Sequence, residues 1–193
     1  MPRVVDHRQR RDELIAVVWQ LIVDDGLPGI TIRRVAARSG WSSGAVRHYL
    51  PTREAILEAA AHRVGEVFEQ RIRRAIASAQ GRDIVVQVLH AMLPADDSSR
   101  RASLVWLAFV GQAASDRSIA DAQGILYRDL HELLVGVLDH LGTAGDPPLG
   151  GSAAVATELQ ALLDGLTVHV LLDRVSLVDA QQVLRTAVDR LLG

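Results

Sequence analysis

A run of hydrogen-bonding side chains between residues 31 and 53 has chemistry suited to polar and anionic surfaces. Arginine can donate two parallel hydrogen bonds to a phosphate or to a guanine edge, and hydroxyl groups bind phosphate oxygens. Glycine and alanine let the backbone come close to a partner, and an alanine methyl can meet the methyl group of thymine. The candidate residues are Thr31, Arg33, Ser42, Ser43, Gly44, Ala45, Arg47, His48, Tyr49, Thr52 and Arg53.

The first element that must position these groups is a short helix after Thr31. Threonine is a favoured residue at a helix N-cap, because its hydroxyl accepts a free backbone N–H of the first turn. Ile32, Val35 and Ala36 follow at helical spacing and form one apolar stripe. Gly40 is placed where this helix ends, since glycine adopts a positive φ without steric cost.

A second short helix is expected over residues 43–50. Ser42 and Ser43 are both suitable caps for its first turn, and Val46 and Leu50 are its buried side. Pro51 ends it, because proline cannot continue the hydrogen-bond ladder. Thr52 is then expected to cap a third helix. Two short helices joined by a glycine turn are typical of a helix-turn-helix unit that binds DNA.

This segment resembles the N-terminal domain of the TetR family of bacterial transcriptional regulators. The residues that carry the resemblance are Thr31, Ile32, Arg33, Val35, Ala36, Gly40, Trp41, Ser42, Gly44, Val46, Tyr49, Leu50 and Arg53. The chain departs from the family pattern at Arg47, Leu50 and Arg53, where an aromatic residue, phenylalanine and lysine are usual. Residues 47–53 are similar to the BetI-type branch, and residues 104–114 and 161–173 resemble its regulatory domain.

Helical spacing continues through the rest of the chain and predicts an all-α fold. With the two short helices, we expect about nine helices, the others near residues 7–25, 53–78, 83–93, 97–115, 118–141, 152–173 and 178–192. Residues 142–151 form the one clear loop. The resemblance implies two parts, a three-helix DNA-binding domain over residues 1–53 and a helical regulatory and dimerisation domain over residues 54–193.

The resemblance also implies roles for the side chains between residues 31 and 53. The helix that starts at Ser43 is expected to enter the major groove, with Ser43, Gly44, Ala45 and His48 near base edges. Tyr49, Thr52, Arg53 and Arg33 are phosphate candidates. Arg47 has two interpretations, a bidentate contact to guanine or a phosphate contact. Tyr49 has an alternative too, which is packing against the first helix.

Charge is unevenly distributed along the chain, although the net charge is only −2. Nine arginines and five acidic residues lie before residue 54, which gives +4 there and −6 in the remainder. All 21 basic residues are arginine, and codon bias explains this better than a function for each of them. A basic N-terminal part is consistent with nucleic-acid contact at one end of the molecule.

The last two predicted helices carry an unusually broad apolar face. It can be the core of one subunit or, as the resemblance favours, the interface of a homodimer in which two helices from each subunit form a four-helix bundle. The interface candidates are Leu159, Leu162, Leu163, Leu166, Val170, Leu184, Val188 and Leu191.

The resemblance further implies a small-molecule pocket among the C-terminal helices. Its candidates are the aromatic and polar residues that interrupt apolar helices, although each of them alone is more often a core residue. They are Phe68, His90, Trp106, Phe109, Gln112, Tyr127, His131 and His169.

Several function classes are disfavoured by the sequence. The absence of cysteine excludes disulfides and cysteine-ligated zinc, and neither a metal nor another cofactor is expected. No catalytic motif is present, and no apolar run is long enough to cross a membrane. We therefore do not expect an enzyme. The resemblance implies a cytoplasmic homodimeric repressor that binds an inverted-repeat operator in double-stranded DNA and is released by a small ligand. The alternative is a helical protein-interaction module without specific DNA binding.

Overall fold

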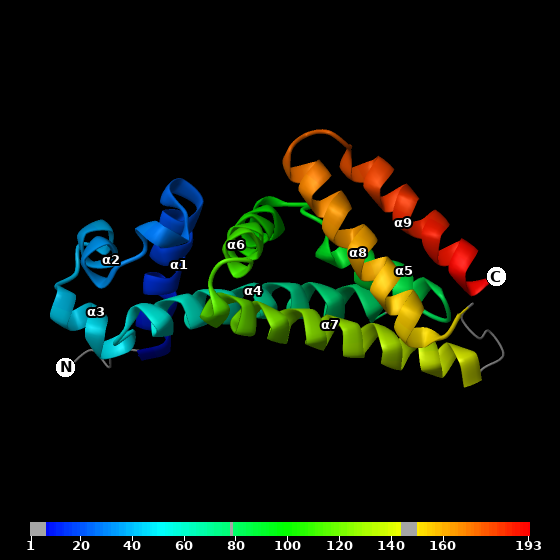
Figure 1. Cartoon of the computed structure of the whole chain (residues 1–193), viewed down its shortest axis with the longest axis horizontal. Coiled ribbons are helices and arrows are strands. Elements are labelled where there is room, and N and C mark those ends of the chain that lie inside the picture. The colour runs from blue at the N-terminus through cyan, green and yellow to red at the C-terminus, as the bar shows by residue number, and fades with distance from the viewer. Residues whose placement is uncertain (1–6, 78, 144–149) are drawn as a thin grey trace. The chain divides into compact units, whose positions relative to one another are not determined.

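The computed structural model describes residues 7–77, 79–143 and 150–193, and these residues form helices and turns without a strand (Figure 1). The chain divides into two compact units, and each is described separately below. The N-terminal unit contains the described residues up to Val64 together with Leu104–Ala122. The C-terminal unit contains Gly65–Ser103 and the described residues from Gln123 to Gly193.

Helix α1 (His7–Asp25) is the first helix of the N-terminal unit, and it contributes buried apolar side chains to its core. A 3₁₀ turn η1 (Leu27–Gly29) connects it to α2 (Ile32–Ser39) and α3 (Ser43–Tyr49), and α4 (Arg53–Ile76) starts after Pro51. The apolar sides of these helices meet in one core, whose fully buried members include Leu14, Val18, Val35, Val46, Leu50 and Ile56. The Trp19 indole N–H donates a hydrogen bond of 3.1 Å to the Ala60 carbonyl and so connects α1 with α4.

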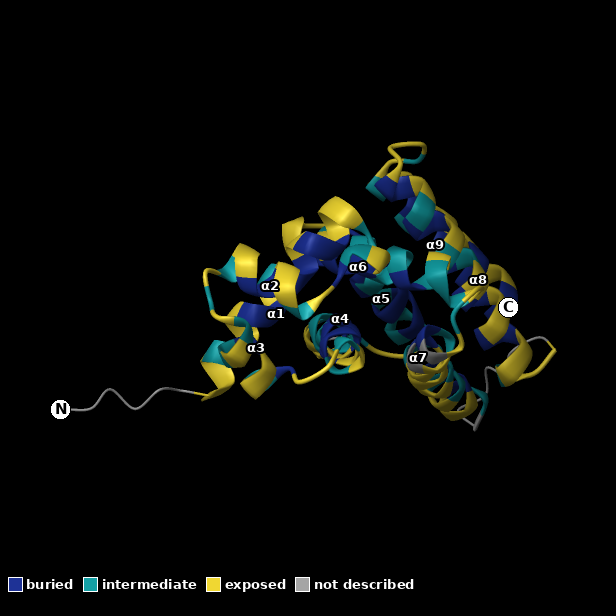
Figure 2. Ribbon diagram, turned by 60° about the vertical axis from the view of Figure 1, so that its left-hand side comes forward, coloured by how far each residue is buried: buried dark blue, intermediate teal, exposed yellow. Residues whose placement is uncertain are grey.

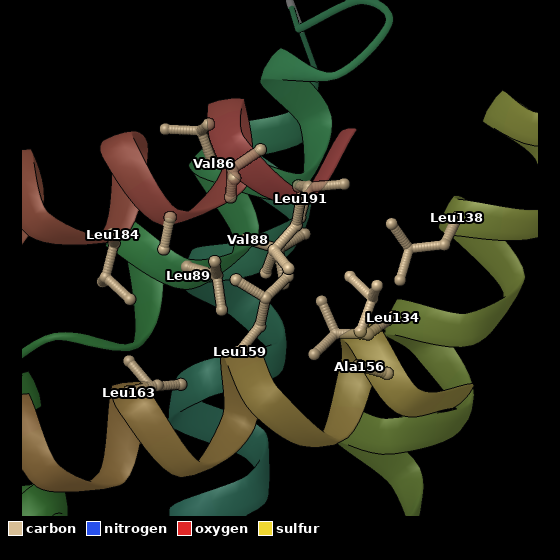
Figure 3. Packing of buried hydrophobic residues seen from close by; sticks show 14 of the residues in the cluster. Val86, Val88, Leu89, Leu134, Leu138, Ala156, Leu159, Leu163, Leu184 and Leu191 are labelled. Carbon is tan, nitrogen blue, oxygen red and sulfur yellow. The ribbon is translucent and has the colours of Figure 1, made fainter. Parts of the chain in front are cut away.

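The C-terminal unit is built around a second apolar core (Figure 3). Side chains from α5 (Asp83–Met92), the later part of α7 (Arg117–Thr143), α8 (Ser152–Leu171) and α9 (Leu177–Leu192) contribute to it. The beginning of α6 (Asp97–Ala113) also belongs to this unit. Within the unit, α4 and α7 approach closely at Gly65, where an added Cβ would lie 3.2 Å from the Leu126 side chain.

Most helix bounds agree with the sequence-based expectation to within about two residues, and all nine expected helices are found in the described part of the chain. The 3₁₀ turn η1 was not expected from the sequence. Its first residue, Leu27, is buried in the core. The predicted loop at residues 142–151 lies for the most part outside the described residues. Gly150 and Gly151, at its end, have positive φ angles of 88° and 94°.

The two compact units do not divide the chain at residue 53. Ile56 and Ala60, in the first two turns of α4, are fully buried and belong to the N-terminal unit. This boundary has a physical reason, because the first turns of α4 complete the core that α1, α2 and α3 leave open.

The start of α6 offers a test of helix capping in the C-terminal unit. Asp96 Oδ1 accepts a hydrogen bond of 2.8 Å from the Ser99 N–H, and the Asp96 N–H donates to Ser99 Oγ at 3.0 Å. Arg71 forms an ion pair with the Asp96 carboxylate, and its Nε donates to the Ala91 carbonyl at 2.7 Å. The backbone hydrogen bond from Ser99, with help from Arg71, lowers the pKa of Asp96 to about 2.

We therefore expect Asp96→Ala to destabilise the C-terminal unit by about 1 kcal/mol at neutral pH, the usual cost of losing an N-cap. A lowered pKa in the folded state stabilises above the ordinary pKa, so this contribution is lost as the pH falls from about 4 to about 2. Thermal melts followed by circular dichroism check it. Asp96→Asn retains a capping oxygen and should cost less, and an Asp96→Ala deficit that persists unchanged at pH 2 would contradict the assignment.

Candidate nucleic-acid interface

Helix α2 is held at both ends by the residues that the sequence singled out. The Thr31 hydroxyl accepts a hydrogen bond of 3.2 Å from the Arg34 N–H and caps the first turn. Gly40 adopts a left-handed conformation, with φ 73° and ψ 13°, and ends the helix. The Trp41 N–H then donates to the Ala36 carbonyl at 3.1 Å, which satisfies one of the free carbonyls of the last turn.

Helix α3 begins at Ser43, because Ser42 is its cap. The Ser42 hydroxyl accepts a hydrogen bond of 3.1 Å from the Ala45 N–H. Val46 and Leu50 are fully buried on the inner side of the segment, as predicted.

The outer side of α3 is open to solvent (Figure 2). Gly44, Arg47 and His48 are exposed, whereas Ser43 and Ala45 are half-buried. The structure thus brings the candidate base-reading residues together on one exposed helix.

The arginines near this surface fall into two groups. Arg34 forms an ion pair of 2.7 Å with Asp25, and Arg38 forms one of 2.9 Å with Asp24. Gly29 makes room for the first pair, since a Cβ there would lie 2.8 Å from an Arg34 nitrogen. The adjacent acids and the two arginines four residues apart were a signal for these pairs that the sequence analysis did not use.

The second group of arginines has no acidic partner among the described residues. Arg33, in the first turn of α2, and Arg47, in the last turn of α3, are both exposed and form no ion pair with any described side chain. Their positive charge is therefore available to an external anion.

Arg53 has internal partners that the sequence did not predict. Its Nε donates to the Ile30 carbonyl at 3.2 Å, and one terminal nitrogen donates to the Leu27 carbonyl at 3.1 Å. The side chain is half-buried, so it connects the start of α4 to the turn that precedes α2. Thr52 caps α4, with its hydroxyl 3.1 Å from the Ala55 N–H.

Tyr49 packs in a small aromatic group beside α3. Its ring centroid lies 5.6 Å from that of His7 on α1, 5.0 Å from that of His48 and 5.7 Å from that of Trp41. Arg10 lies over the Trp41 ring at 5.5 Å and also forms an ion pair with Glu13. Packing against the first helix, one of the two interpretations of Tyr49, is thus present in the structure.

The ligand-pocket candidates are divided between the two units. Trp106, Phe109 and Gln112 belong to the N-terminal unit, where Phe109 is fully buried and the Gln112 amide donates to Ser115 Oγ at 3.1 Å. The other candidates, in the C-terminal unit, are Phe68, His90, Tyr127, His131 and His169.

Phe68 is buried, His131 is half-buried and His169 is exposed. His90 lies 3.0 Å from the Gln181 carbonyl, and burial lowers the pKa of its imidazole. Tyr127 donates to Asp164 at 2.7 Å.

Seven of the eight dimer-interface candidates are buried inside their own subunit. Leu159, Leu163, Leu166, Val170, Leu184, Val188 and Leu191 form part of the C-terminal core, and Leu162 packs against it. These side chains hold α8 and α9 to each other and to the neighbouring helices (Figure 3). These side chains therefore have little accessible surface left in the single subunit.

Two kinds of feature were not found in the described part of the chain. Among the described residues, no group of three or more histidine, aspartate or glutamate side chains could hold a metal ion. In the same part of the chain, no helix is long and apolar enough to cross a membrane.

The internal hydrogen bonds of Arg53 lead to a stability prediction. We expect Arg53→Met to lower the unfolding free energy of the N-terminal unit by about 1–2 kcal/mol, because two carbonyls lose a charged donor. Arg47→Met is the matched control and should change it by less than about 0.5 kcal/mol, as is usual for exposed residues. All three tryptophans, Trp19, Trp41 and Trp106, belong to the N-terminal unit, so urea unfolding followed by their fluorescence measures it. Equal losses in the two variants would contradict the structural role of Arg53.

Comparison with known proteins agrees with this geometry. Residues 81–193 match the family model described as BetI-type transcriptional repressor, C-terminal. The HTH-type transcriptional regulator PksA of Bacillus subtilis (strain 168) is 31% identical over 179 residues, which cover 91% of this chain and 85% of PksA. The HTH-type transcriptional regulator BetI of Burkholderia cenocepacia (strain HI2424) is 32% identical over 168 residues, covering 86% of this chain and 84% of BetI.

A solved structure of a transcriptional regulator from Saccharomonospora viridis, in complex with choline, has the same fold. Its TM-score is 0.81 at 22% identity, and the match covers 94% of this chain and 96% of that one. The curated relatives are regulators of transcription, and none of those named is an enzyme. The chain therefore belongs to the TetR family of transcriptional regulators, with a C-terminal region of the BetI repressor type.

Proposed function

We propose that this protein binds an inverted-repeat operator as a homodimer and represses transcription in the cytoplasm until a small ligand releases it. The exposed outer side of α3, where Gly44, Arg47 and His48 lie together, is the observation that carries this proposal. A solvated helix with a polar outer side and a glycine that permits close approach fits the major groove.

Base reading is assigned to the first turns of α3 and to His48. Ser43, Gly44 and Ala45 are at the N-terminal end of this helix, the part that meets base edges in helix-turn-helix proteins. The half-buried Ala45 presents a methyl group suited to thymine, and the exposed His48 presents ring nitrogens.

Phosphate contacts are assigned to the free charges and to the capping hydroxyls. Arg33 and Arg47 have no acidic partner among the described residues. The hydroxyls of Thr31 and Ser42 accept backbone hydrogen bonds and still carry a proton to donate. Such contacts fix the register of a protein on DNA without reading its sequence.

The exposed apolar residues support a dimer through α8 and α9. Six large apolar side chains are exposed in the described part of the chain, and three of them lie near the turn between these helices. They are Leu172, Val178 and Val183, with exposed fractions of 61%, 72% and 42%. Burying these side chains against a second copy would remove apolar surface from water.

A protein-interaction module without DNA binding is the alternative function. It would use the same surface of α8 and α9 but would give no role to the unpaired Arg33 and Arg47. Repression, in contrast with activation, is supported by the repressor-type family model that matches residues 81–193.

Selection of random duplex DNA on the purified protein at two salt concentrations tests the DNA proposal. We expect enrichment of an inverted repeat, and we expect Arg47→Ala to reduce the slope of log affinity against log salt by about 1 per subunit. Arg74→Ala, which changes an exposed arginine of the C-terminal unit at the end of α4, is the control with the same change of charge. Recovery of no common sequence, or equal slopes for the two variants, would refute the proposal.

The dimer surface has a separate test by sedimentation. We expect Val183→Glu to convert a dimer into a folded monomer, because it places a charge on the exposed side of α9. Val23→Glu, which changes an exposed valine of α1, should remain dimeric. Leu166→Glu should instead unfold the C-terminal unit, since Leu166 is buried in its core. A Val183→Glu variant that stays dimeric would place the interface elsewhere.

A further inference from the structure

Four polar side chains of the C-terminal unit form a cluster between α7 and α8, which we call the Tyr127 cluster. It consists of Gln123 and Tyr127 on α7 and of Gln160 and Asp164 on α8. The Tyr127 hydroxyl donates to Asp164 Oδ2 at 2.7 Å, and the Gln160 amide donates to the Tyr127 carbonyl at 3.0 Å. Only Tyr127 was identified from the sequence, because the cluster is assembled from two helices more than thirty residues apart.

Gln123 is the unusual member of the cluster. Its side chain is 4% exposed, and neither its amide nitrogen nor its amide oxygen has a hydrogen-bond partner among the described groups. The amide is close enough to the Tyr127 hydroxyl to oppose the rise in the pKa of that group, but it does not meet hydrogen-bond geometry. A buried amide without partners is destabilising, because it has lost its hydrogen bonds to water and gained none, so a cluster that served only folding would be poorly built.

Asp164 has no basic partner among the described residues, and its side-chain hydrogen bond there is with Tyr127. Partial burial raises the pKa of its carboxyl group, because the ionised form is less well solvated there than in water. Burial and the neighbouring carboxylate also raise the pKa of Tyr127, so the phenol stays neutral and keeps donating its proton. The Tyr127 hydroxyl is therefore the point at which the Gln123 amide and the Asp164 carboxylate converge.

We propose that the Tyr127 cluster binds the ammonium group of a protonated primary or secondary amine. The carboxylate of Asp164 supplies the counter-charge, and the oxygen of Gln123 accepts an N–H hydrogen bond that no described group donates. This inference rests on the proposed ligand-controlled function and names the chemical class of the ligand.

The hydrogen-bonding capacity of the cluster distinguishes this class from related ones. A quaternary ammonium has the charge but no N–H, so it would leave the Gln123 oxygen without a partner. An alcohol has the donor but not the charge, and a carboxylate would be repelled by Asp164. An analogue that lacks the matching group binds weakly, because it leaves a buried polar group of the site without a hydrogen-bond partner.

Four probes with the same six-carbon chain test the proposal on the purified full-length protein without DNA. They are hexylamine, hexyltrimethylammonium, hexanol and hexanoate, compared by isothermal titration at pH 7 and low ionic strength. We expect hexylamine to bind at least tenfold more tightly than each of the other three. Asp164→Asn should abolish this preference, whereas Asp129→Asn, an exposed carboxylate on α7, should retain it.

Gln123→Met separates a binding role from a structural one. It removes both unpaired polar atoms at nearly constant volume, so we expect the unliganded protein to melt at an equal or higher temperature while hexylamine binding weakens at least tenfold. A lower melting temperature with unchanged binding would make Gln123 a folding residue and overturn the proposal.

Equal binding of hexylamine and hexyltrimethylammonium, a preference that survives Asp164→Asn, or binding of none of the four probes would also overturn it. Because no DNA is present, these outcomes are independent of the operator selection that tests the proposed function.

Discussion

The helices α2 and α3 are eight and seven residues long, and helices of this length are not stable in water by themselves. They persist because one apolar side of each is buried and because their free backbone groups are satisfied locally. Val35 and Val46 are completely buried, and Thr31 and Ser42 cap the two first turns. The exposed side of α3 can carry glycine, arginine and histidine only because the opposite side and the ends hold the helix in place.

The local part of this arrangement was predictable from the sequence. Caps, the glycine at the end of α2 and the proline after α3 act within a few residues, so their signals are contained in short segments. The partners of Arg53 were not predictable in the same way. Its acceptors, the carbonyls of Leu27 and Ile30, lie 26 and 23 residues earlier, and backbone carbonyls have no residue-specific signal. Sequence reasoning therefore assigned a charge at a helix start to phosphate, and the structure shows it hydrogen-bonded within the subunit.

The last two helices show a second limit of sequence reasoning. Periodicity identified their apolar faces correctly, but it does not reveal whether α5 and α7 or another subunit covers them. Seven of the eight leucines and valines predicted at a dimer interface are buried in the C-terminal core, whereas Leu172, Val178 and Val183 are the large apolar residues exposed in α9 and in the turn before it. The Tyr127 cluster was missed for a related reason. Its members lie on α7 and α8, and Gln123, Gln160 and Asp164 look unremarkable when each helix is considered alone.

The separation of exposed and buried residues within the α3 segment also has an evolutionary consequence. Gly44 and Arg47 contribute little to packing, whereas Val46 and Leu50 on the same segment are fixed by the core. Exposed positions usually accept substitution with little change in stability. Under the proposed DNA-binding function, duplicated copies of such a gene can therefore diverge at an exposed base-reading position such as Gly44, and acquire new operators, before any compensating change is needed in the core. The lineage can explore DNA specificity at nearly constant foldability.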